Sequence, residues 1–160
     1  MLSRTMPWRR RLTPILRPLY RAYARLSRGM TLGVRGVVLN PAGEVLLVEH
    51  TYVAGWHLPG GGVELGETTE AALARELVEE AGVAIVGRPT LVTVHSNPGT
   101  FRGDHVLLYR VLGWTACQAT SRGEILQVGW FSPQALPPGT TAATRRRVAE
   151  ALSAALANDR

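Results

Sequence analysis

Residues 61–83 read GGVELGETTEAALARELVEEAGV, a glycine-rich turn that passes into a helical pattern. The pattern predicts a helix over Thr69–Ala81 that ends at Gly82, because glycine readily takes the left-handed conformation that closes a helix. At about 100° per residue, apolar residues gather on one side of this helix. We expect that side to pack on the core, through Ala71, Ala74, Leu77, Val78 and Ala81.

The opposite side of the predicted helix carries Glu76, Glu79 and Glu80, with Ala72 between them. Like charges at this spacing cost roughly 0.2–0.5 kcal/mol per pair, and the negative end of the helix dipole adds about 0.3–1 kcal/mol per anion. No basic residue stands four positions after any of the three. A solvated acidic face is one interpretation; a bound divalent cation is the simpler one. All-oxygen ligands without cysteine or histidine at ligand spacing favour Mg²⁺ or Mn²⁺ over zinc.

The same stretch resembles the Nudix box, G-x5-E-x7-R-E-U-x-E-E-x-G-U with U aliphatic, and every fixed position is filled. Residues 56–60 (WHLPG) and 129–133 (GWFSP) also resemble segments of that family, so the resemblance spans about residues 31–157. It implies an α/β fold, the Nudix-type α/β/α sandwich with a mixed β-sheet between helices.

The family resemblance also implies an activity: Mg²⁺-dependent hydrolysis of a phosphoanhydride bond in a nucleoside diphosphate linked to another group, X. Carried over by position, Gly61 would supply a carbonyl ligand, Glu79 and Glu80 would be the firmest carboxylate ligands, and Glu76 would ligate, act as base, or both. Arg75 and Glu67 would pair to hold the loop and orient Glu76.

A further acid outside the box usually completes such a site. We expect Glu124, with Asp104 as its rival; a surface carboxylate is the plain alternative for each. Arg35 and Arg102 are candidates for binding the substrate phosphate, although each is equally well interpreted as an ordinary exposed arginine.

The remaining marked residues have simpler interpretations. We expect His57, His95 and His105 to be strand or loop residues, because none has metal-pair spacing. Arg145–Arg147 is interpreted as a solvated face. Pro98 is a weak hint of ADP-ribose-type substrates and is adequately explained as part of a turn.

Short β-like runs flank the box. We expect strands at Thr31–Asn40 and Glu44–His50 joined by a turn at Pro41–Gly43. Further elements are predicted in this order: strands at Thr90–His95, His105–Leu112 and Leu126–Phe131, and a helix at about Thr141–Ala157. The element order is strands, helix, strands, helix. This order indicates a mixed sheet covered by helices on both faces.

The charge is distributed unevenly. The net charge is +6, and all 18 basic residues are arginines, eight of them in the first 30 residues, where there is no acid. We therefore divide the chain into a basic amphipathic arm, 1–29, and a Nudix hydrolase domain, 30–160. The arm would pack on the domain or on a second subunit, giving a homodimer, or would contact nucleic acid or an anionic membrane. A transit peptide is a weaker alternative.

Composition sets the outer bounds. A chain of 160 residues with 46% hydrophobic residues predicts one folded domain. The lone Cys117 excludes an intrachain disulfide and is expected to be buried. We expect no membrane span and no secretory signal, and hence a cytoplasmic protein with a nucleotide-type substrate. Two alternative functions are considered. The first is a non-catalytic binding module with the Nudix fold, and the second is an enzyme that the arm directs to RNA 5′ ends or to a membrane.

Overall fold

The computed structural model describes residues 29–97, 103–121 and 123–158. Its regular elements, in chain order, are β1 (Thr31–Val38), β2 (Val45–His50), β3 (Trp56–His57), α2 (Thr69–Ala81), β4 (Val83–Ile85), β5 (Thr90–Ser96), β6 (Asp104–Val111), β7 (Trp114–Ala116), β8 (Ile125–Phe131) and α3 (Ala142–Asn158). Residues Thr31–Arg160 form one compact unit, and every contact below lies within it. The predicted arm falls outside the described residues, apart from Gly29.

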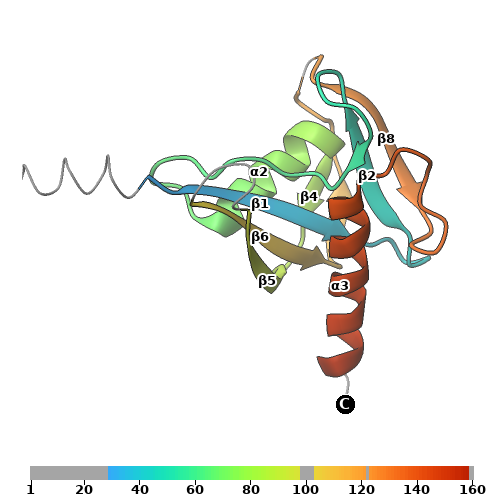
Figure 1. Ribbon diagram of the computed structural model, residues 1–160. Coiled ribbons are helices and arrows are strands. Elements are labelled where there is room, and N and C mark those ends of the chain that lie inside the picture. The colour runs from blue at the N-terminus through green and yellow to red at the C-terminus, as the bar shows by residue number, and fades with distance from the viewer. Residues whose placement is uncertain (1–28, 98–102, 122, 159–160) are drawn as a thin grey trace, which may run out of the picture. The chain divides into compact units, whose positions relative to one another are not determined.

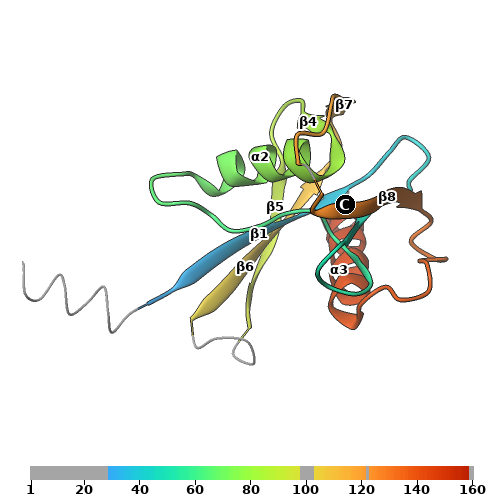
Figure 2. The same ribbon diagram turned by 90° about the horizontal axis from the view of Figure 1, so that it is seen from above.

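The strands are divided among three small sheets. One has the order β1-β6-β5, with β1 parallel to β6 and β5 antiparallel to it. In the second, β2 lies between β3 and β8 and is antiparallel to both. The third pairs β4 with β7. Helices α2 and α3 lie on opposite faces of β1 and β6 (Figures 1 and 2), which confirms the predicted α/β/α architecture.

Strand alternation explains why both faces of β1 are covered. Successive side chains of a strand point to opposite faces, so a strand rich in valine can bury both. On one face, Val34 and Val38 share a core with α2. On the other face, Val37 shares a second core with Val148 and Ala151 of α3. The strand is therefore fixed between two helices.

Helix α2 has the predicted bounds. Its first turn is capped by the Thr68 hydroxyl, which accepts from the backbone N–H of Ala71 at 3.1 Å. It ends at Gly82, whose φ of 63° is left-handed as expected. The predicted core side needs correction: Ala72 is buried with Leu73 and Leu77, whereas Ala71 is exposed. The face that meets β1 is therefore rotated relative to the predicted apolar stripe.

Other predictions are refined by the structure. The turn at Pro41–Gly43 is present, but β1 meets β2 only through the Leu39–Val45 bridge. β3 lies in residues 56–60, which the family resemblance assigned to the strand that enters the box, whereas β4 and β7 were not predicted, because three residues are too few for a periodic signal. Cys117 is exposed, contrary to expectation, since it follows the short peripheral strand β7. No described helix is long and apolar enough to cross a membrane.

Candidate metal and substrate site

The loop that follows β3 is fixed to β1 by backbone hydrogen bonds. The N–H groups of Val34 and Gly36 donate to the carbonyls of Gly61 and Pro59, both at 2.9 Å. Gly60 has a φ of 136°, and a side chain there would collide with the Val34 carbonyl. Only glycine allows this approach, so β1 sets the position of the loop.

Arg75 joins this loop to helix α2. It donates to both carboxylate oxygens of Glu67 at 3.0 Å and to the carbonyl of Gly62 at 3.0 Å. Its Nη1 lies 2.7 Å from Glu76 and 3.5 Å from Glu79. These partners, Glu67 foremost, raise the pKa of Arg75, and Arg75 lowers the pKa of Glu67. The expected Arg75–Glu67 pair is present.

Glu80 differs from the other two glutamates because it is buried. Its side chain is only 9% exposed, and its Oε2 accepts from the N–H of Gly60 at 2.9 Å. Burial raises the pKa of Glu80 to about 7, although the Gly60 N–H and the charge of Arg35 lower it; the charges of Glu76 and Glu124 raise it further. Its nearest basic group, Nε2 of His50 at 3.7 Å, belongs to a ring whose pKa is lowered by burial. Glu80 is thus a buried carboxylate beside a neutral imidazole.

The donor atoms around Gly61 suit a hard cation. A Cβ built at Gly61 would lie 2.7 Å from Oε2 of Glu76, so the carboxylate packs directly against this backbone. Within the described ranges no three acidic or imidazole side chains already converge as a metal centre; Arg75 holds Glu76 and Glu79, and Gly60 holds Glu80. All the available donors are oxygens, which fits Mg²⁺ or Mn²⁺.

The two candidates for the additional acid lie in different places. The Glu124 carbonyl accepts from the N–H of Thr51, just beyond β2. Glu124 is exposed, and its charge raises the pKa of both Glu80 and His50. Asp104 begins β6 and lines a cavity instead. The electrostatic effect on Glu80 therefore connects Glu124, rather than Asp104, with the glutamate cluster.

The histidines are placed as expected, with one omission. His57, His95 and His105 lie in β3, β5 and β6. His50, which the sequence analysis did not select, contacts the site at the end of β2. The available signal was a histidine at the end of a strand that begins with four apolar residues.

The arginines divide between surface and interior. Arg145 and Arg146 are exposed, as predicted for a solvated face. The prediction is wrong for Arg147, which is half-buried and lines the same cavity as Arg35. A helix presents neighbouring residues 100° apart, so a run of three cannot all face solvent when the helix packs on a sheet. Arg102 and Pro98 lie outside the described residues.

Together, the α/β/α fold and a helix of carboxylates behind a glycine loop define a class of proteins suited to metal-assisted chemistry on phosphates. Within that class, the chain belongs to the Nudix hydrolase family, since a profile of the NUDIX domain matches residues 29–152.

Individual relatives agree with this assignment. The chain is 34% identical over 108 residues to a putative 8-oxo-dGTP diphosphatase of Bacillus subtilis, covering 67% of this chain and 70% of that protein. It is 36% identical over 103 residues to a MutT-like protein of Streptomyces ambofaciens, covering 64% of each, slightly less than two thirds. Its fold is similar to the crystal structure of a MutT NUDIX hydrolase from Burkholderia pseudomallei, with 27% identity, a TM-score of 0.64, and coverage of 75% of this chain and 96% of that one.

Proposed function

We propose that this protein hydrolyses the phosphoanhydride bond of a nucleoside diphosphate linked to a second group, X, with Mg²⁺ as cofactor. The observation that carries the proposal is Glu80, a buried carboxylate next to Glu76 and the Gly61 loop. Ionising this buried carboxyl group without an ion-pair partner is costly, and a divalent ion would offset that cost.

The chain's own residues would divide the work as follows. Glu76, Glu79, Glu80 and the carbonyl of Gly61 would hold the ion, with the Gly61 oxygen using the lone pair that Val34 leaves free. When bound, the ion supplies charge neutralisation on the diphosphate and a more acidic water. Mn²⁺ suits the same donors.

A base completes this proposal. Glu124, whose charge raises the pKa of Glu80, would take the proton from the attacking water, with Glu76 as the alternative. Arg75 and Glu67 would position Glu76 by clamping the loop to α2. They act through other residues rather than on the substrate.

The relatives suggest which substrates to test. Their names include an 8-oxo-dGDP phosphatase of mouse, a NAD-capped RNA hydrolase of Citrobacter koseri and an RNA pyrophosphohydrolase of Blochmanniella floridana. These share a nucleotide with a cleavable phosphoanhydride, which supports a nucleotide-type substrate here. Intact acids at all box positions argue against a non-catalytic binding module.

A substrate screen tests the proposal. Nucleoside diphosphate sugars, dinucleotides, oxidised and normal nucleotides and capped RNA would be incubated with Mg²⁺ or Mn²⁺, and the phosphorylated products measured. We expect Glu124→Gln to lower kcat by about 100-fold, and Asp104→Asn to lower it far less. Failure to cleave any member at saturating metal would contradict the proposal. Comparing RNA and anionic-liposome binding with and without residues 1–29, at rising salt, would test the arm.

A further inference from the structure

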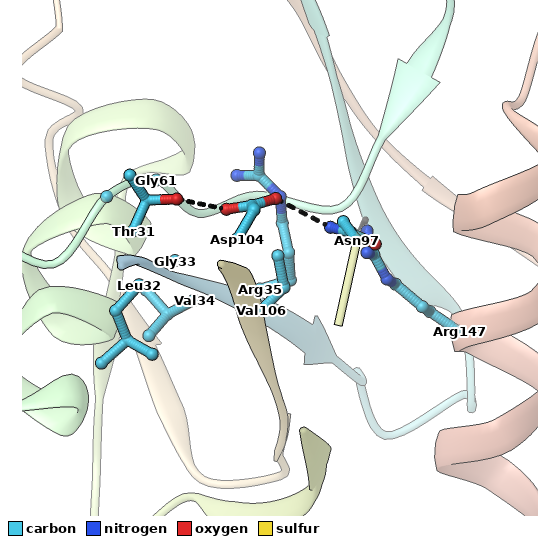
Figure 3. Close-up of a pocket in the computed structure, with 11 residues that line it drawn as sticks. Thr31, Leu32, Gly33, Val34, Arg35, Gly61, Asn97, Asp104, Val106 and Arg147 are labelled. Carbon is cyan, nitrogen blue, oxygen red and sulfur yellow. Dashed lines mark hydrogen bonds between the residues drawn. The ribbon is translucent and has the colours of Figure 1, made fainter. Parts of the chain in front are cut away.

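A second charged region lies on the other side of the Gly61 loop. It is a cavity of about 300 Å³ between β1, β6 and α3. Arg35 enters it from β1 and Arg147 from α3, while Asn97 and Asp104 line it from the ends of β5 and β6. Figure 3 shows Arg147 reaching from its helix toward Asn97, with Asp104 between Asn97 and Thr31. Its volume is at the lower end for a small-molecule site.

Neither guanidinium in the cavity has a partner among the described residues. Nη1 of Arg35 and Nε of Arg147 are sealed from solvent and make no hydrogen bond. No carboxylate in the described ranges lies within 4.0 Å of either guanidinium. Buried charged donors are normally paired, so two unpaired guanidiniums in one cavity need an explanation.

Asp104 offsets only part of the charge of these arginines: it raises the pKa of Arg147 but makes no ion pair or hydrogen bond with either arginine. Its two oxygens already accept hydrogen bonds, one from the Thr31 hydroxyl at 2.8 Å and one from the Asn97 amide at 3.1 Å. Those neutral donors lower the pKa of Asp104. The carboxylate is therefore satisfied where it stands, and the unused hydrogen-bonding capacity of the cavity consists mainly of guanidinium donors.

The two arginines also repel each other. Burial lowers the pKa of Arg147, and the charge of Arg35 lowers it further, while the charges of Asp104 and Glu150 raise it by smaller amounts. A protein gains nothing in stability from two like charges brought together away from water. An oxyanion between them would relieve the repulsion and accept from both, because the planar guanidinium fork matches phosphate and carboxylate oxygens.

We propose that this cavity binds a second oxyanion of the substrate, a phosphate monoester or a carboxylate carried beyond the scissile diphosphate. The inference rests on the proposed function and narrows its substrate class. Gly61 connects the two regions, because it lines the cavity and also contacts Glu76. A diphosphate held at Glu76 would therefore extend directly into the cavity. A neutral nucleobase is less suitable, because it would leave the two charges unneutralised.

Matched substrate pairs test the proposal directly. NAD⁺ with NADP⁺, dephospho-coenzyme A with coenzyme A, and UDP-glucose with UDP-glucuronate each differ by one oxyanion. We expect kcat/KM to favour the anionic member of at least one pair by about tenfold or more. Saturable uptake of inorganic phosphate by the metal-free protein, at constant ionic strength, gives a readout that needs no catalysis.

Variants on α3 assign the effect to the cavity. Arg147→Gln should bring the ratio of kcat/KM between the anionic and the neutral member of a pair close to one, and should abolish phosphate uptake. Arg147→Lys, which keeps the charge but not the fork, should restore part of both. Arg146→Gln is the matched control, because Arg146 is the exposed neighbour on the same helix. Circular dichroism and thermal melts confirm that each variant is folded.

The outcomes separate this inference from the proposed function. Hydrolysis with no preference in any pair, and no saturable phosphate uptake, would overturn the inference and leave the proposed function standing. Arg147-dependent phosphate uptake without hydrolysis of any substrate would support an oxyanion site in the cavity and overturn the proposed function. An Arg147→Gln protein that keeps both the wild-type ratio and its phosphate uptake would also overturn the inference.

Discussion

The two sides of the Gly61 loop balance their charges in opposite ways. On the α2 side, Arg75 contacts three carboxylates at once, so each of them has an ion-pair partner within the protein, although their summed charge stays negative. On the α3 side, Arg35 and Arg147 have no such partner in the described residues. Glu80 is the exception on the acidic side, because no guanidinium pairs with it. The ligands proposed above are placed at the groups that lack an ion-pair partner, rather than at charged groups in general.

The largest expected effect is on Glu80. Replacing it by glutamine removes the one buried carboxylate that Arg75 does not neutralise, and we expect Glu80→Gln to lower the rate by at least about 100-fold at saturating Mg²⁺. Initial rates over a Mg²⁺ titration measure this. Near wild-type turnover would show that the acidic side does not hold the catalytic metal.

A smaller effect is expected when Arg75, the ion-pair partner of the other glutamates, is replaced. Arg75→Gln frees Glu76 and Glu79 and loosens the loop, and we expect about a tenfold loss in kcat, typical of residues that orient metal ligands. The control is Arg88→Gln, which removes the exposed pair with Glu70 and should change kcat little. If both variants had equal activity, the Arg75 network would not position the site.

The last effect is on stability rather than on rate, and its sign follows from the pKa of Glu80. In the folded state the Glu80 carboxyl group stays protonated up to about pH 7, whereas in the unfolded chain it ionises near pH 4.5. As pH rises between these values, metal-free protein should lose about 2–3 kcal/mol of unfolding free energy relative to Glu80→Gln. Subtracting the variant removes the contribution of His50, whose lowered pKa acts in the opposite direction.

Urea unfolding at pH 5 and pH 8, with chelator present, measures this difference. Adding Mg²⁺ to the wild type should restore stability at pH 8, since the ion binds the folded state. A difference between the two proteins that is independent of pH would contradict the assignment of the titration to Glu80.

Local signals made helix α2 and the loop before it predictable from sequence. A capping threonine, a closing glycine and the spacing of the Nudix box all lie within 23 residues, so the bounds of the helix and the Arg75–Glu67 pair were expected correctly. The absence of a basic residue four positions after each glutamate suggested that the cluster has no partner. Arg75 stands four positions before Glu79 and pairs with it from that side.

The cavity could not be predicted in the same way. Its arginines are separated by more than 100 residues and meet only because α3 packs on the face of the sheet that contains β1. In the sequence, Arg147 was one member of a run of three, and only the packing of α3 on the sheet distinguishes it from its neighbours. His50 was missed for a similar reason, since its contact with Glu80 depends on where β2 meets the start of the loop.

The fixing of the loop to β1 has a consequence for selectivity. Val34 holds the carbonyl of Gly61, and the next residue, Arg35, enters the cavity. With the two subsites as proposed, neighbouring residues of one strand, buried on both faces, would set the spacing between the scissile bond and the second oxyanion. We then expect a change in substrate length to require new side chains on β1, β6 and α3 rather than a movement of the loop.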